Sequence, residues 1–444
     1  MTSLKTARPP LSSPQPPARQ GHFGLILMGL IGNVMEWYDF AVYGYFAGVL
    51  GKLFFPQEDP GASLIASFGA FAAGFLMRPL GGLVFGRIGD RLGRERAMSL
   101  SVLAMAVPTV LMALLPTYAD IGLAAPIILV GLRIVQGLSV GGEYTSSLIY
   151  LAENAPPHRR AFTAIWGSWG AVLGMLLGSG VGLMTARLLE APALESWGWR
   201  IPFAVGGVVA TVGYLLRRHL PKDPPRHPEQ MALAALIRTH GRAMARVILI
   251  NIGYGVAYYT VFVYAVTYIR SIDHLPEAVA LEINTLSMLT LLLILPLAAL
   301  FADVLGHLKL AKISLPLLCL LAYPLFLGIH SEDTTRILLA EIGFAVLVAL
   351  TSGGMVVLNV ALLPDEVRCT GLALAYNLAH GVFGGTTPLV AAWLLRETDN
   401  PLTPAMWLSG ALVVSSLTLL LLVRKHHLQP FLSQTQPQRR ENGD

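Results

Sequence analysis

Charged residues are scarce in this chain, and cysteine is almost absent. Charged side chains make up 13% of the 444 residues, about half the share that soluble domains carry. The two cysteines, Cys319 and Cys369, indicate neither a disulfide framework nor a Cys-rich metal site. These deficits exclude an ordinary cytosolic enzyme, a disordered protein and a disulfide-stabilised scaffold.

Motifs for nucleotide or metal chemistry are also missing from the sequence. Gly141-Gly142 and Gly384-Gly385 lack the Lys-Ser/Thr pair that a phosphate-binding loop needs. HExxH motifs and cysteine clusters are absent. We therefore expect a protein that is not an enzyme and that uses no cofactor or metal. The expected partners are a small organic solute, protons and the lipid bilayer.

Long apolar stretches recur along the whole chain. Hydrophobic residues make up 54% of it, and the mean hydropathy is +0.62. A membrane-spanning helix needs about 20 apolar residues. Twelve spans are predicted, near 24–50, 63–85, 98–115, 124–150, 162–188, 199–217, 246–269, 278–300, 311–329, 336–358, 368–394 and 404–423. In the fifth, Gly170, Gly174, Gly178 and Gly182 recur every four residues, which favours close helix packing.

The positive charges predict the orientation of these spans. With the N-terminus inside, most of the 31 Lys and Arg residues fall in cytoplasmic segments, as membrane proteins generally arrange them. The net charge of +5 is therefore a topology signal, and no nucleic-acid partner is expected. We predict a cytoplasmic tail (1–21), a six-helix bundle (22–217), a cytoplasmic linker (218–245), a second six-helix bundle (246–424) and a second cytoplasmic tail (425–444).

Weak internal similarity supports two related halves. Asp90-Arg-Leu-Gly93 follows the second span, and Asp303-Val-Leu-Gly306 follows the eighth. The second copy is degraded, since His307 stands where the first has Arg94. Transporters built from repeated halves bind substrate near the membrane midplane, between the halves.

Several ionisable residues lie inside the predicted spans, and four of them are the main candidates for function. Glu36 and Asp39 are in the first span, Arg78 in the second and Arg133 in the fourth. Intramembrane charges face a partner or a cavity and mark proton or substrate paths. We expect Glu36 and Asp39 to couple transport to protons, with either one as the carrier. Arg78 and Arg133 are expected to bind a substrate carboxylate, or to form salt bridges with Glu36 or Asp39 that break on protonation.

Other polar side chains are candidates for the substrate cavity. Asn33 shares a face with Glu36 and Asp39, and Gln136 lies one turn from Arg133. Tyr254 and Tyr258 on the seventh span could hold a quaternary ammonium by cation–π contact. Asn377 and His380 on the eleventh span complete the set, although tyrosines and a lone histidine in such helices more often serve packing.

The segment Gly86-Arg-Ile-Gly-Asp90-Arg91-Leu-Gly93-Arg94-Glu-Arg96 resembles the signature loop of the major facilitator superfamily. Five further motifs in order resemble the metabolite:proton symporter family within it. They are Gly32-Asn33-Val-Met-Glu36-Trp37-Tyr38-Asp39-Phe40, Phe75-Leu-Met-Arg78-Pro79-Leu-Gly81-Gly82, Arg133-Ile-Val-Gln136-Gly137 running to Gly141-Gly142-Glu143-Tyr144, Trp197-Gly-Trp-Arg200-Ile-Pro202-Phe203, and Val367-Arg368-Cys-Thr370-Gly371 running into Gly384-Gly385. The resemblance implies an all-α integral membrane protein of the major facilitator fold. It also implies a gating latch in which Glu143 and Asp90 pair with Arg87, Arg91 or Arg94.

These observations predict a secondary transporter of the cytoplasmic (inner) membrane that functions as a monomer. It would take up, with protons, a small solute bearing a carboxylate. The resemblance extends to citrate and 2-oxoglutarate carriers and to proline/betaine carriers, and both solute types carry a carboxylate. An exporter or exchanger of the same fold and a transport-dead membrane sensor are the alternatives.

Overall fold

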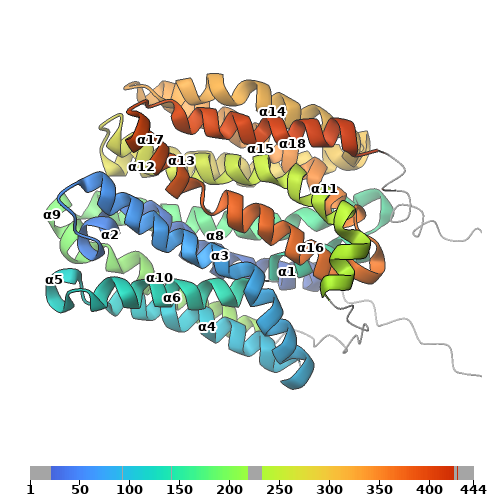
Figure 1. The fold of residues 1–444 in the computed structure, drawn as a ribbon, viewed down its shortest axis with the longest axis horizontal. Coiled ribbons are helices and arrows are strands. Elements are labelled where there is room, and N and C mark those ends of the chain that lie inside the picture. The colour runs from blue at the N-terminus through green and yellow to red at the C-terminus, as the bar shows by residue number, and fades with distance from the viewer. Residues whose placement is uncertain (1–21, 93, 142, 219–232, 425–427, 429–444) are drawn as a thin grey trace, which may run out of the picture.

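The computed structural model describes residues 22–92, 94–141, 143–218, 233–424 and 428, and every regular element in these ranges is helical (Figure 1). The helices before the gap at 219–232 form the N-terminal half. They are α1 (His22–Tyr45), α2 (Ala47–Phe54), α3 (Pro60–Leu92), α4 (Arg94–Leu114), α5 (Tyr118–Ile121), α6 (Ala124–Val140), α7 (Glu143–Asn154), η1 (Pro157–Arg159), α8 (Arg160–Leu188), α9 (Ala191–Ala193), η2 (Leu194–Gly198) and α10 (Arg200–Arg218).

The helices after the gap form the C-terminal half. They are α11 (Leu233–Tyr259), η3 (Thr260–Tyr264), α12 (Ala265–Ser271), α13 (Glu277–Leu305), α14 (His307–Ile329), α15 (Thr334–Ala361), η4 (Asp365–Val367), α16 (Arg368–Asn377), η5 (Leu378–Gly384), α17 (Thr387–Thr398) and α18 (Thr403–Leu422). Helix α11 begins at Leu233, so part of the stretch expected as a linker is helical.

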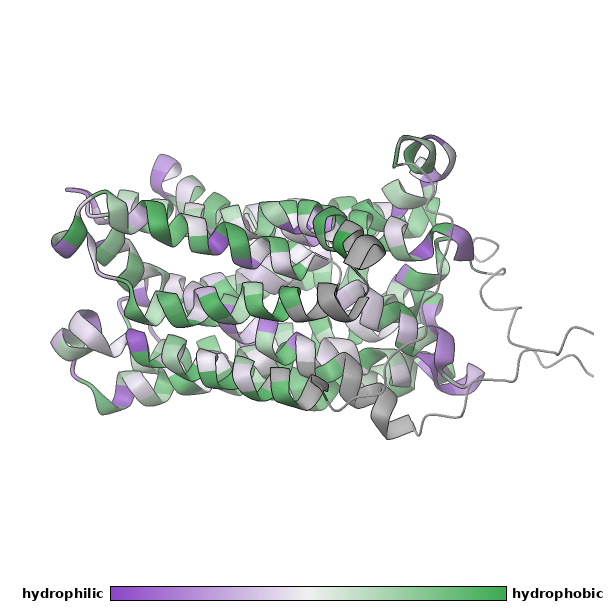
Figure 2. Ribbon diagram, turned by 90° about the horizontal axis from the view of Figure 1, so that it is seen from below, coloured by the Kyte–Doolittle hydropathy of each residue, from purple (hydrophilic) through white to green (hydrophobic). Residues whose placement is uncertain are grey.

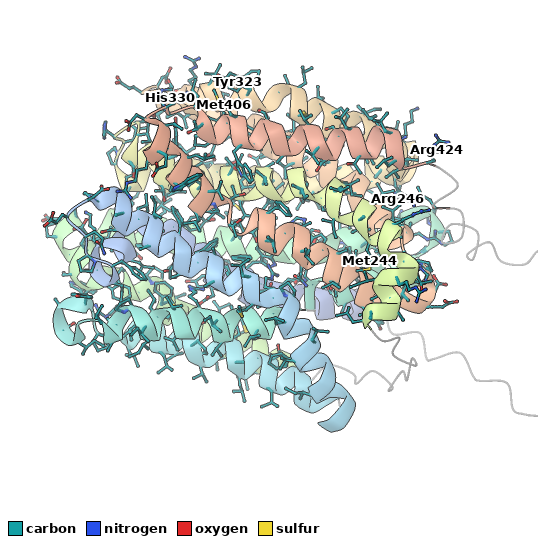
Figure 3. All side chains as sticks on the ribbon, in the orientation of Figure 1. Met244, Arg246, Tyr323, His330, Met406 and Arg424 are labelled. Carbon is teal, nitrogen blue, oxygen red and sulfur yellow. The ribbon has the colours of Figure 1, made fainter. Side chains whose placement is uncertain are left out.

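The long helices run side by side, with apolar residues along their length and polar residues gathered at both ends (Figure 2). Nine helices in the described ranges are long and apolar enough to cross a membrane, and two shorter apolar stretches are Leu100–Leu114 and Arg200–Val212. His330 and Met406 lie at one end of the bundle, and Arg246 and Arg424 lie at the other (Figure 3). We call these the distal end and the terminal end.

Each half packs mainly within itself. In the N-terminal half, α1 lies along α8, α3 along α6 and α4 along α10; in the C-terminal half, α15 packs on α13 and α14, and α11 on α18. The halves meet along α8 and α13, and α3 contacts α17. The interface between the halves thus runs through the middle of the bundle.

Small residues let the helices approach closely. A Cβ atom added at Gly137 of α6 would lie 1.8 Å from the carbonyl oxygen of Gly74 on α3. The glycine stripe of α8 lies against α1 as expected: a Cβ added at Gly174 would lie 2.3 Å from the carbonyl oxygen of Val34. Glycine at these positions allows backbone-to-backbone contact, which is a common basis of helix packing in membranes.

Substitution at Gly137 provides a test of this packing. We expect Gly137→Ala to lower the melting temperature of the purified protein, because a methyl group there must push α3 away from α6, at a cost of about 1–3 kcal/mol. The matched control is Gly131→Ala on the same helix, where an added Cβ would meet nothing within 4 Å. Equal melting temperatures for the two variants would contradict the close α3–α6 contact.

Candidate functional site

A buried ion pair joins α6 to α1 in the middle of the N-terminal half. Arg133 Nη1 lies 2.7 Å from Asp39 Oδ2, and both side chains are almost fully buried. The other oxygen of Asp39 accepts a hydrogen bond of 2.7 Å from Thr109 of α4. The guanidinium also stacks on the ring of Tyr43, 4.1 Å from its centroid. Both carboxylate oxygens of Asp39 are thus occupied by donors.

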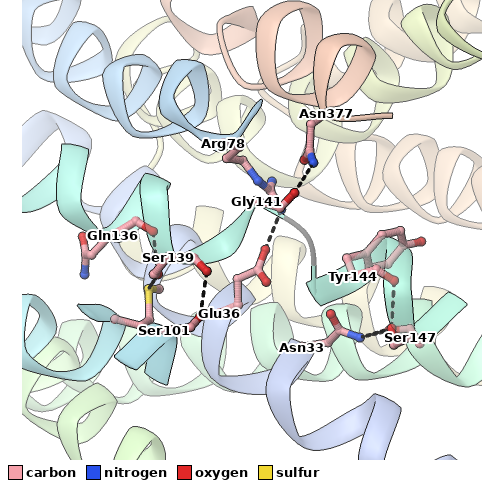
Figure 4. Close-up of polar contacts among 12 residues, drawn as sticks. Asn33, Glu36, Arg78, Ser101, Gln136, Ser139, Gly141, Tyr144, Ser147 and Asn377 are labelled. Carbon is pink, nitrogen blue, oxygen red and sulfur yellow. Dashed lines mark hydrogen bonds and ion pairs between the residues drawn. The ribbon is translucent and has the colours of Figure 1, made fainter. Parts of the chain in front are cut away.

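A second buried pair lies near it on the same face of α1. Arg78 Nη2 of α3 lies 2.5 Å from Glu36 Oε1, and these side chains are 3% and 4% exposed (Figure 4). The guanidinium carbon lies 5.4 Å from the ring centroid of Trp37 and 5.2 Å from that of Phe75. Arg78 therefore contacts aromatic faces as well as its carboxylate.

The two pairs balance their own charges in a medium where an unpaired charge is costly. The three-residue spacing of Glu36 and Asp39 points both carboxylates at arginines of neighbouring helices. Protonation of one carboxylate would leave its arginine with an unmatched positive charge. Such an arginine would be ready to bind an anionic group of a solute.

An aromatic chamber, formed by Trp37, Tyr144, Tyr254, Tyr258 and Tyr376, lies beside Arg78. Trp37 contacts Tyr144 and Tyr258, with ring centroids 6.4 and 5.9 Å apart. Tyr144 stacks on Tyr376 at 5.1 Å. Trp37 and Tyr144 come from the N-terminal half and the other three from the C-terminal half. The chamber is therefore built across the interface between the halves.

His380 closes one side of this chamber. Its ring stacks on that of Tyr376, with centroids 4.0 Å apart, and lies 5.7 Å from that of Tyr254. It belongs to η5, a π-helical turn, and a second π-helical turn, η3, follows Tyr259 in the facing helix. Such turns occur often at functional sites because they re-aim side chains.

The cavity between the halves at the centre of the bundle is small, whereas a larger one of about 460 Å³ lies nearer the distal end, between α3, α12 and α17. A cavity lined by Tyr144, Ser168, Asn251, Tyr254 and Tyr376, among others, has a volume of about 10 Å³, roughly what one water molecule needs. This central cavity is therefore too small to hold an organic solute in the conformation seen here.

Contacts between the halves close the terminal end. The carboxylate of Asp303 accepts hydrogen bonds of 2.9 Å from the backbone N–H groups of Ala161 and Phe162 at the start of α8. Arg368 Nη1 lies 2.7 Å from Glu153 Oε1. A carboxylate at a helix N-terminus is favoured by the helix dipole. Asp303, which belongs to the degraded second copy of the repeated motif, therefore still supplies a contact between the halves.

Other contacts close the distal end. Arg187 of α8 pairs with Glu282 of α13, and Arg396 lies 2.9 Å from Asp59. Deeper in, Asn284 donates to Ser179 at 3.0 Å. The first two pairs are exposed and individually weak, so breaking them when the distal end opens would cost little energy.

The remaining predicted residues make hydrogen bonds that join helices. Asn33 of α1 donates to the carbonyl of Gly167 on α8 (3.2 Å). Gln136 of α6 donates to the hydroxyl of Thr109 (3.0 Å), which in turn donates to Asp39. Asn377 donates across the interface to the carbonyl of Gly141 (2.6 Å, Figure 4). The predicted latch involves Arg87, Asp90, Arg91, Arg94 and Glu143, whose backbones lie in described helices but whose side chains lie outside what the structure describes.

Some site residues were missed by reasoning from the sequence. Thr109 stands in an apolar run with nothing to single it out, yet it links Asp39 to Gln136. Trp37, Tyr144 and Tyr376 come from three helices, and only the fold brings them together. Glu341 could have been selected from the sequence, because it is an acidic residue inside a predicted span. It is completely buried in the structure.

Known proteins similar to this chain are transporters. Residues 25–226 match the family described as "Sugar (and other) transporter". The glycine betaine/proline/ectoine/pipecolic acid transporter OusA of Dickeya dadantii is 34% identical over 409 residues, covering 88% of this chain and 81% of that protein. The citrate-proton symporter of Salmonella typhi is 32% identical and covers 92% and 95% of the two chains.

The chain belongs to the metabolite:proton symporter family of the major facilitator superfamily. The fold agrees: the xylose transporter XylE of E. coli, in a partially occluded inward-open conformation, superposes with a TM-score of 0.73 at 20% identity, covering 91% of this chain and 98% of that one. This symporter-family member is therefore a multi-pass membrane transporter and not an enzyme.

The Arg133–Asp39 pair can be tested by its effect on stability. We expect Arg133→Met to lower the free energy of unfolding by about 3–5 kcal/mol, because it leaves a carboxylate buried without its countercharge. Adding Asp39→Asn should recover much of this loss, because the neutral amide needs no countercharge. The measurement is the melting temperature of purified protein.

The control for this pair is Lys52→Met, which removes one partner of the exposed Lys52–Glu195 pair and should cost about 1 kcal/mol or less. A double variant no more stable than Arg133→Met would contradict the assignment of Arg133 as the countercharge of Asp39.

Proposed function

We propose that this protein is a proton-coupled importer of a zwitterionic solute, such as glycine betaine or proline. The observation that carries the proposal is the aromatic chamber beside the Arg78–Glu36 pair. The guanidinium would bind the carboxylate of the solute, and the aromatic faces would bind its ammonium group. The carrier named for glycine betaine and proline at 34% identity supports the same solute class.

The charge balance favours a zwitterion over a polyvalent acid. Each buried arginine already has a carboxylate partner, so the site offers no net positive charge until a proton arrives. One proton frees one arginine, which matches one carboxylate. Citrate, which the relative from Salmonella typhi carries by name, would bring several negative charges to this site.

The proposed coupling begins with protonation of Glu36. The proton neutralises the carboxylate and releases Arg78, which then binds the solute carboxylate next to Trp37. With its charges balanced again, the loaded site can close at one end of the bundle and open at the other. Release of the solute returns Arg78 to Glu36 and expels the proton. The Arg133–Asp39 pair holds α1 and α6 in place throughout and is the second candidate for the proton.

The proposed topology has twelve spans in two bundles of six, with both termini in the cytoplasm. The spans are the nine long apolar helices, the two shorter apolar stretches and α1. In this orientation, Arg246 and Arg424 lie on the cytoplasmic side, in keeping with the positive-inside rule. We place the protein in the inner membrane as a functional monomer that uses the proton gradient and no cofactor.

The test uses purified protein in liposomes with a pH dye inside and no starting gradient. Adding glycine betaine outside should acidify the lumen, and Glu36→Gln should abolish the signal because the amide cannot carry a proton. Arg78→Gln should raise the half-saturating concentration about 30- to 1,000-fold, as expected when a buried charged contact worth about 2–4 kcal/mol is lost.

The matched control is Glu195→Gln, a carboxylate that is exposed at the distal end and should not affect transport. Alkalinisation of the lumen would identify an exchanger instead. A response to citrate but not to glycine betaine would refute the zwitterion assignment. No response to either, with no binding of labelled solute, would favour the sensor.

A further inference from the structure

A carboxylate in the C-terminal half is buried without a countercharge. Glu341 lies on α15, seven residues after its start at the distal end, and is 0% exposed. Neither of its carboxylate oxygens receives a hydrogen bond of normal geometry. The hydroxyl of Ser287 on α13 lies close to this carboxyl group but donates to the main-chain carbonyl of Glu341, at 3.3 Å.

The surroundings of Glu341 are neutral and rich in oxygen atoms. Among the described residues, no Lys, Arg or His forms an ion pair with it. The titratable group that interacts with it is the phenol of Tyr45 on α1. The hydroxyl of Tyr45 and Oδ1 of Asn284 are also buried without hydrogen-bond partners. The charged groups of the packed helices lie elsewhere. Arg187 of α8 pairs with Glu282 of α13 at the exposed surface, and Glu277 pairs with Arg270. The remaining ones lie toward the terminal end: Arg160 of α8, Asp303 of α13, and His307, Lys309 and Lys312 of α14.

An ionised carboxylate in such a place would be very costly, because no countercharge offsets its loss of water and the one hydroxyl beside it, that of Ser287, makes no hydrogen bond of normal geometry to its oxygens. Burying the neutral carboxylic acid would cost far less, and its O–H could donate to an oxygen acceptor such as Asn284 Oδ1 or the Tyr45 hydroxyl. The chemistry of the surroundings therefore suits a neutral, protonated Glu341.

The position of Glu341 links this proton to the movement of the halves. Asn284 donates to Ser179 of α8 at 3.0 Å, and Ser179 shares a hydrogen bond of 2.8 Å with Thr285. Tyr45 and Ser179 belong to the N-terminal half, and Glu341, Asn284 and Thr285 to the C-terminal half. Opening of the distal end would separate these residues and admit water to Glu341.

We propose that Glu341 is a second proton-binding site, protonated while the distal end is closed and able to release its proton when that end opens. It lies in the other half of the protein from Glu36 and Asp39, and it uses no arginine. The protonation of Glu341 is independent of the proposed function. A role for this proton in solute transport rests on the proposed function.

The experiment is infrared spectroscopy of the full-length protein in lipid at neutral pH, without solute. We expect a C=O stretching band from a buried protonated carboxyl group, lost in Glu341→Gln. The matched control is Glu282→Gln, a carboxylate one helix away and exposed, which should leave the band unchanged. Glutamine has the shape of the protonated acid, so the variant is expected to fold. Glu341→Asp, a second variant, should shift the band without removing it.

A band that persists in Glu341→Gln and is unmoved in Glu341→Asp would overturn the proposal. For the transport role, an inward gradient of about one pH unit is imposed, in which each coupled proton contributes about tenfold to solute accumulation. Glu341→Gln should then reduce accumulation about tenfold, and unchanged accumulation would overturn that role. A wild-type protein that shows the band but moves no solute would refute the proposed function alone.

Discussion

The cost of burying charge in a membrane protein governs this structure. Arg78 and Arg133 are almost fully buried, and each is held by a carboxylate of α1. Because α1 supplies both carboxylates, it ties α3 and α6 into one half and sets where a proton or an anion can be bound. The closely packed glycines bring these helices near enough for short side chains to reach their partners. The buried ion pairs therefore depend on the close helix packing that the glycines allow.

The interface between the halves follows from the same constraint. The aromatic chamber combines Trp37 and Tyr144 from one half with Tyr254 and Tyr376 from the other, and it provides faces that attract a cation without placing a buried anion there. Hydrogen bonds and ion pairs join the halves at both ends of this interface, with exposed pairs at the distal end and mostly buried groups at the terminal end. In the proposed mechanism, protonation or solute binding at the centre shifts which end is closed.

The helical membrane architecture could be predicted from the sequence because long apolar runs have few structural solutions in a bilayer. Glu36, Asp39, Arg78 and Arg133 were also predictable, since charges are conspicuous within apolar spans. Their pairing was not, because the sequence allows either arginine to meet either carboxylate. Tyr254 and Tyr258 were predicted, but the roles of Thr109, Trp37, Tyr144 and Tyr376 were not, as nothing local distinguishes these four from packing residues. Asp303 looked like a remnant of a repeat, and only the position of α8 gives it hydrogen-bond partners.

The central claim is that a solute and a proton bind at the site together. The proton neutralises Glu36, and Arg78 then pairs with the carboxylate of the solute. Its most direct test is calorimetric titration of the purified protein with glycine betaine in buffers of different ionisation enthalpy. We predict that the apparent binding enthalpy changes with the buffer in the wild-type protein, which reports uptake of protons on binding, and that this dependence disappears in Glu36→Gln. Binding of glycine betaine with the same enthalpy in every buffer would contradict the account.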